Sequence, residues 1–149
     1  MQKKGPLSLG VNQLGGLLCA KPNALRPDMQ VYINPITYRP ALQGGRRPIL
    51  PDREPGFIFS FNACRPYSTG RVEITDPDWR QPPRIDGNYL SDERDLDDVV
   101  AMARLIGKMQ DSATIKGLLA APVETGLSAM SDQAIINDFR ERSGTVFHP

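Results

Sequence analysis

The feature that most constrains the fold is a change of hydrophobic period close to residue 90. Before that point apolar residues recur at every second position, and after it they recur at intervals of three and four residues. Alternation is typical of strands, whereas a period of about 3.6 residues is typical of amphipathic helices. Strands followed by helices predict an α+β fold, in which helices pack on one face of an antiparallel β-sheet.

Two segments in the first third of the chain predict strands. Residues 14–20 are the weaker candidate, and Met29–Asn34 alternates more clearly. The apolar face of the second segment would hold Met29, Val31 and Ile33. Residues 35–56 contain five prolines, so we predict a long excursion there without regular structure.

The strongest hairpin prediction lies in the middle of the chain. Residues 56–65 alternate, and a return segment at 71–75 follows a turn at 66–69. In such a hairpin Val72 and Ile74 would face the aromatic side of the first strand. That side consists of Phe57, Phe59 and Phe61.

Three segments after the change of period predict helices. The longest would be capped by Asp92, or by the serine before it, and would run through Met109 with apolar residues at helical spacing. A short helix is expected within residues 112–120. Ser131 would cap a third helix that ends near Arg142.

Composition narrows the classes of function. Lys and Arg number 18 against 17 Asp and Glu, a net charge of +1, so nothing electrostatic favours nucleic acid or an anionic membrane as partner. No apolar run approaches the roughly 18 residues of a membrane span. Cys19 and Cys64 have no metal-ligand spacing, which predicts buried thiols, no metal site and a cytoplasmic location.

Few residues point to chemistry by themselves. No P-loop and no Gly-x-Gly-x-x-Gly fingerprint occurs, and the single histidine, His148, would be solvated near the end of the sequence. We interpret the acidic residues that open the long helix as a solvated helix N-terminus, where carboxylates complement the helix dipole. These residues are Asp92, Glu93, Asp95, Asp97 and Asp98.

Several short motifs follow one another in a fixed order. They are the run from Arg65 to Val72, then Pro83-Arg84-Ile85, Asn88-Tyr89-Leu90 and finally Thr145-Val146-Phe147-His148-Pro149. Their order and spacing resemble the Arg-Pro-x-Ser-x-Gly-x-Val, Pro-x-Ile, Asn-Tyr-Leu and His-Pro-x-Gly-Thr-Cys elements of the glucose-methanol-choline (GMC) flavoprotein oxidoreductases. The chain resembles the C-terminal substrate-binding domain of that family, which includes choline dehydrogenase and aryl-alcohol oxidase.

This resemblance implies that residues 1–149 form a single substrate-binding domain of an enzyme that oxidises the CH–OH group of an alcohol by hydride transfer to FAD. The FAD fingerprint and the end of the last motif are absent from the sequence. We therefore expect a fragment of a larger enzyme, inactive alone because the cofactor carries the redox chemistry. Expected partners are a small-molecule alcohol and an FAD-binding domain of the same or a companion chain, with homo-oligomerisation left open.

The resemblance also suggests roles for individual residues. His148 would take the part of the family's active-site base. The polar face of the sheet would meet the substrate through Tyr32, Asn34, Ser60 and Asn62. A sheet face turned to solvent is the alternative for these four side chains. For the chain as a whole, the alternative is a stand-alone, non-catalytic binding or interaction module derived from the same domain.

Overall fold

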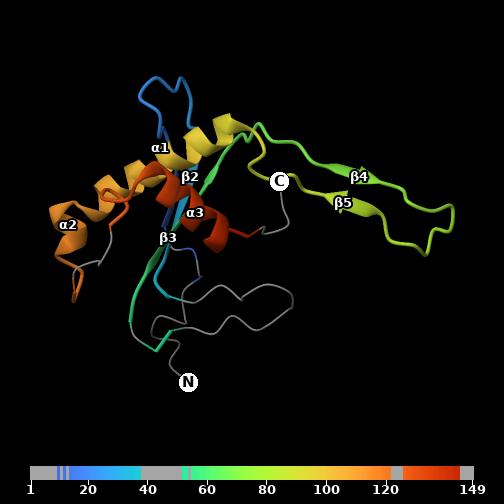
Figure 1. Ribbon diagram of the computed structural model, residues 1–149. Coiled ribbons are helices and arrows are strands. Elements are labelled where there is room, and N and C mark those ends of the chain that lie inside the picture. The colour runs from blue at the N-terminus through green and yellow to red at the C-terminus, as the bar shows by residue number, and fades with distance from the viewer. Residues whose placement is uncertain are drawn as a thin grey trace.

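The computed structural model describes residues 10, 12, 14–37, 52–53, 55–121 and 126–144. Its main sheet has three antiparallel strands in the order β1, β2, β3. These strands are β1 Leu14–Leu18, β2 Met29–Asn34 and β3 Ile58–Ala63. The helices pack against this sheet (Figure 1), so the expected α+β fold is confirmed.

Strand register decides which side chains meet the helices. Val31 lies opposite Gly16 on one side and Phe61 on the other, and Met29 lies opposite Ala63. Because side chains alternate along a strand, these residues share one face. Met29 and Val31 are buried there, and the ring of Phe61 lies 5.5 Å from that of Phe139 on the last helix. The predicted apolar face of the sheet is therefore confirmed.

The three predicted helices form close to their expected bounds: α1 Glu93–Gln110, α2 Ala113–Lys116 and α3 Asp132–Arg142. Each begins where a side chain accepts a backbone N–H of the first turn, which stabilises a helix start. The capping side chains are Asp92, Ser112 and Ser131. Local capping chemistry thus fixes where these helices begin.

The core lies between β2 and the two long helices. Its buried members are Met29, Val31, Val99, Met102, Ala103, Ile106 and Ile135. Arg104 of α1 holds the segment that precedes α3, because its guanidinium donates to the carbonyl oxygens of Leu127 and Met130 at 2.9 and 2.7 Å. No helix in the described part of the chain has the length and apolar composition needed to cross a membrane.

The predicted central hairpin is wrong. β3 pairs with β2, whereas the segment expected to return along β3 forms β4 Arg71–Glu73 and pairs with β5 Arg84–Asp86. We call residues 71–86 the ribbon; it extends away from the main sheet and helices (Figure 1). Val72 and Ile74 are 68% and 90% exposed instead of facing the phenylalanines.

The physical reason is that β4 finds a charge-matched partner across the turn that follows it, while β3 pairs with β2. The turn at residues 76–81 closes the ribbon, with Asp78 N–H donating to Asp76 Oδ1 at 2.7 Å and Gln81 N–H to the Asp78 carbonyl at 2.9 Å. Pairing across this turn matches Glu73 with Arg84 and Arg71 with Asp86. Most of the predicted excursion at 35–56 lies outside the described residues, and its described parts contain no helix or strand.

Candidate functional site

The four polar side chains predicted on the sheet do share its second face. Tyr32 lies opposite Ser60, and Asn62 lies opposite Gln30, so these residues alternate with those that meet the helices. Because α1 and α3 cover the other face (Figure 1), this polar face points away from the helices. Gln30 belongs to the same face, as the alternation of β2 predicts, although it is not among the four predicted site residues.

Tyr32 stands between two small neighbours. Gly15 of β1 lies directly beside it on one side and Ser60 of β3 on the other. A Cβ added at Gly15 would lie 3.7 Å from Cδ1 of the Tyr32 ring. Larger residues at these two positions would crowd the phenol, so the small ones leave its ring accessible to a molecule that approaches this face.

Asn34 is the most unusual residue of the polar face. Its side chain is only 4% exposed, and its Oδ1 accepts no hydrogen bond from the residues that the structure describes. A buried acceptor without a donor costs about 1 to 3 kcal/mol. Most buried polar atoms avoid this cost, so an orphaned one needs an explanation. Asn34 Oδ1 is therefore an acceptor whose hydrogen bond the described residues do not use, although it has almost no exposed surface in this state.

Asn62 differs from Asn34 in burial and in bonding. It is exposed, and its Nδ2 donates to the carbonyl oxygen of its neighbour Ala63 at 3.1 Å. Tyr32 and Ser60 are half-buried. The four predicted residues therefore lie on one surface, with an unpaired acceptor at one end of β2 and a solvated amide towards the other.

A second polar centre joins the root of the ribbon to α1. The buried carboxylate of Asp95 accepts the backbone N–H groups of Tyr67 and Ser68 at 2.7 and 2.8 Å, and it also accepts the Ser68 hydroxyl. Ser68 Oγ in turn accepts the N–H groups of Ser91 and Asp92 at 3.0 Å. We call this network the Ser68–Asp95 junction.

Electrostatics follow from these contacts. Burial by itself would raise the pKa of Asp95, but the hydrogen bonds from Ser68 and Tyr67 outweigh it and hold the pKa below 3.8. Beside it, the side-chain hydrogen bonds from Arg94 lower the pKa of Asp92 to about 2. The Arg94 guanidinium also lies 4.1 Å from the centre of the Tyr67 ring. The carboxyl groups of Asp92 and Asp95 are thus ionised at neutral pH.

The interpretation of the acidic cluster as a solvated helix end is wrong for two of its members. Asp95 is 3% exposed, and Asp98 is 9% exposed and pairs with Lys21. The hydrogen bond to Asp98 raises the pKa of Lys21. Glu93 and Asp97 are exposed as predicted. No sequence signal near residue 95 identifies its partner, because Ser68 lies 27 positions away.

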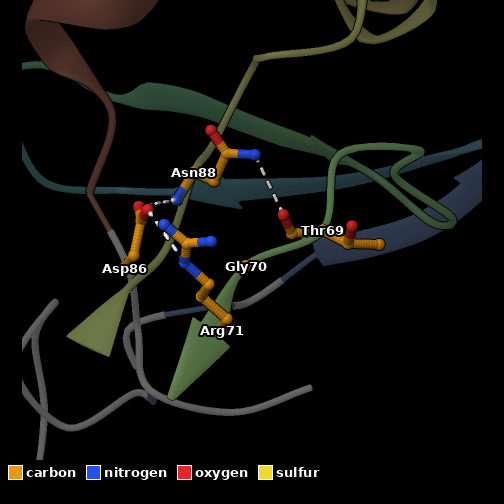
Figure 2. Close-up of a pocket in the computed structure, with 5 residues that line it drawn as sticks. All are labelled: Thr69, Gly70, Arg71, Asp86 and Asn88. Atoms are coloured by element: carbon orange, nitrogen blue, oxygen red, sulfur yellow. Dashed lines mark hydrogen bonds and ion pairs between the residues drawn. The ribbon is translucent and has the colours of Figure 1, made fainter. Parts of the chain in front are cut away.

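A polar hollow of about 390 Å³ lies at the base of the ribbon (Figure 2). Arg71 Nε lies 3.9 Å from Asp86 Oδ2, and Asn88 Nδ2 donates to the Thr69 carbonyl at 3.0 Å. Ligand pockets are mostly apolar, with a few convergent polar groups. Here the polar groups satisfy one another across the hollow, so we interpret these contacts as the closure of the ribbon base.

The described residues do not fit the diphosphate of FAD. Such a group binds where free N–H groups and the positive end of a helix face it. α1 instead begins with Asp92, Glu93 and Asp95, and α3 begins with Asp132, so carboxylates occupy both positions. Any binding of FAD diphosphate would therefore fall to another part of the protein.

Two further predictions have different outcomes. His148 lies outside the described residues, so its predicted role is untested. Both cysteines are free, but Cys19 is exposed and Cys64 is half-buried, so the prediction of buried thiols is wrong for Cys19. Cys19 follows directly after β1, and the alternation that places Leu18 opposite the buried Met29 places Cys19 on the other side of the strand.

Comparison with known proteins places these features in a family. A family model described as GMC oxidoreductase matches residues 66–149. An alcohol dehydrogenase (acceptor) from Pseudomonas putida is 29% identical over 150 residues, which cover 99% of this chain and 26% of that protein. An oxygen-dependent choline dehydrogenase from Pseudomonas fluorescens (strain Pf0-1) is 25% identical over 137 residues, 92% of this chain and 23% of that protein. The chain spans about a quarter of these relatives.

Proposed function

Because this chain belongs to the GMC oxidoreductase family, we propose that it forms the substrate-binding part of an FAD-dependent alcohol oxidoreductase. The relatives whose names state an activity support this, since they are an alcohol dehydrogenase and choline dehydrogenases. The substrate would be a small alcohol oxidised at its CH–OH group. The motifs from Arg65 to Leu90 that suggested this family lie almost entirely within the matched residues.

The observation that carries the proposal is the unpaired, buried Oδ1 of Asn34 on the polar face of the sheet. A substrate-binding surface needs polar groups whose hydrogen bonds are not already used within the protein. Tyr32 and Ser60 lie on the same face and are half-buried. Together with Asn62 they would orient a polar molecule held over this face.

His148 is our candidate for the group that accepts the hydroxyl proton of the alcohol. Imidazole is suited to this work near neutral pH, and general-base assistance typically contributes roughly 100-fold to 10,000-fold in rate. The cofactor, FAD, would accept the hydride, and its diphosphate would be held by the part of the enzyme that this chain does not span. The chain by itself would then be inactive.

The test uses the full-length enzyme that contains this chain. We expect Asn34→Ala and Tyr32→Phe to change the ratio of kcat/KM values between alcohols of different size and polarity by about tenfold, because each removes a contact that discriminates substrates. Gln133→Ala, at an exposed position of α3, is the matched control. An alcohol profile that is the same in both variants and in the control would contradict the proposed substrate face.

A second measurement addresses His148. His148→Ala should lower kcat by about 100-fold or more with the flavin still bound, as loss of a general base predicts. Flavin absorbance measured on the same sample separates loss of catalysis from loss of the cofactor. A kcat within about threefold of the parent value would remove His148 from the proposed mechanism.

One observation favours the alternative of a non-catalytic binding module, namely the exposed apolar side chains of Val72, Ile74 and Ile85, which would suit contact with another protein. The coding sequence on both sides of this chain separates the two proposals. A glycine-rich strand-turn-helix segment upstream in the same frame would support the oxidoreductase. A gene that encodes neither this segment nor a companion flavoprotein would support the module.

A further inference from the structure

The two faces of the ribbon differ in chemistry. One face carries Arg71, Glu73, Arg84 and Asp86. Two ion pairs cross the strands at 3.9 Å, and Arg71 also lies 3.4 Å from Glu73 along β4. The opposite face carries Val72 directly opposite Ile85. Ile74 lies two residues beyond Val72, on the same side by the alternation of an extended chain. We call Val72, Ile74 and Ile85 the apolar face of the ribbon.

This apolar face is uncovered. Val72, Ile74 and Ile85 are 68%, 90% and 73% exposed, and Trp79 at the turn of the ribbon is 84% exposed. Contiguous exposed apolar surface of this kind marks sites of interaction. A two-stranded ribbon without a packing partner is also marginally stable in water. Both arguments indicate that the apolar face of the ribbon packs on another surface.

The base of the ribbon is nevertheless held firmly. The Ser68–Asp95 junction fixes its entry to the first turn of α1. Gly70 lies so close to the opposite strand that a Cβ there would overlap the carbonyl oxygen of Asp86. The root is thus built to hold the ribbon away from the sheet at a set position (Figure 1). A ribbon whose root is held in place and whose apolar face is uncovered is suited to dock on another surface.

We propose that the apolar face of the ribbon docks on the cofactor-binding part of the same oxidoreductase, an inference that rests on the proposed function. The residues that match the family model include the whole ribbon, so the ribbon lies within the part of the chain that resembles such enzymes. The relatives extend over about four times the length that matches this chain. That additional part would supply the complementary apolar surface.

The test compares amide hydrogen exchange in the full-length enzyme and in the 149-residue chain alone. We expect ribbon peptides covering residues 70–88 to exchange at least about tenfold more slowly in the full-length enzyme, because docking suppresses local opening. Val72→Asp combined with Ile85→Asp should abolish that protection. Glu73→Gln, on the charged face, is the matched control and should leave it in place.

Two additional readouts keep this proposal separate from the proposed function. Flavin absorbance and alcohol turnover report on the proposed function, whereas ribbon exchange reports on docking. Flavin binding with equal ribbon exchange in both proteins would overturn docking and leave the oxidoreductase intact. Ribbon protection in the isolated chain that rises with its concentration would identify a second copy as the occupant and would also overturn the proposal. Unchanged exchange in α1 shows that each variant is folded.

Discussion

The sheet with its helices and the ribbon are stabilised by different means. In the main sheet and its helices, Met29, Met102 and Ile106 are at most 2% exposed and pack in one apolar cluster. In the ribbon, three-residue strands hold ion pairs between exposed side chains, which contribute about 0 to 1 kcal/mol each. One region is stable through burial within the described chain, whereas the other leaves its apolar surface uncovered.

The difference shows how stability and recognition are divided in this molecule. Burial holds the main sheet and the helices together around one close-packed core, and we call this region the platform. The ribbon gains its order from a fixed root and from a small number of cross-strand contacts. Segments with few buried contacts are those in which local opening and partner contacts occur.

The largest expected effect comes from the platform. Met102→Ala should lower the free energy of unfolding by about 3 to 4 kcal/mol, because it removes a buried side chain and leaves a cavity. Ile74→Ala in the ribbon should change it by less than about 0.5 kcal/mol, since that side chain is already exposed. Urea unfolding followed by circular dichroism measures both. Equal losses in the two variants would contradict the comparison between the regions.

An intermediate effect is expected at the Ser68–Asp95 junction. Asp95→Asn should destabilise the chain by about 2 kcal/mol at pH 7, because the amide cannot accept all three hydrogen bonds. The pKa of Asp95 is lower in the folded state, so its contribution is complete above pH 3.8 and is lost as the pH falls through the folded value. Stability measured from pH 6 to pH 2 should therefore fall less steeply in Asp95→Asn, and an unchanged slope would contradict this.

The smallest effect on global stability should come from Gly70→Ala. The added Cβ would overlap the carbonyl oxygen of Asp86, so β4 and β5 should separate at their base. We expect the main sheet and α1 to lose less than about 0.5 kcal/mol, because neither contacts this position in its core. Amide exchange of residues 71–73 and 84–86 should rise, while α1 peptides stay unchanged. A global loss of structure would show that the ribbon supports the platform.

Helices and strand faces could be predicted because their signals are local. Asp92, Ser112 and Ser131 each cap a helix within three residues of the group they bind. The alternation of Met29 to Asn34 assigned buried and polar faces correctly. β5, with three residues and one apolar side chain, carries too weak a pattern to be recognised. The strand pairing was predicted wrongly because β5, the partner of β4 across the next turn, was not recognised.

The candidate site was predictable in part for the same reason. Tyr32, Asn34, Ser60 and Asn62 follow from alternation, so their common face could be foreseen. The orphaned Oδ1 of Asn34 could not, because burial at the end of a strand depends on what packs around it. Asp95 was misread since acidic residues at a helix start are usually solvated, and its acceptor role depends on a distant serine.

The Ser68–Asp95 junction also constrains how this sequence can be exchanged with those of relatives. Serine and aspartate lie 27 positions apart, and without its partner side chain each would lose the hydrogen bond between them. A recombinant protein whose crossover falls between them would join the ribbon root of one parent to the helix of another. Such chimeras inherit a matched pair only when both residues come from a single parent or happen to coincide. In evolution, the two positions should therefore be inherited as one unit.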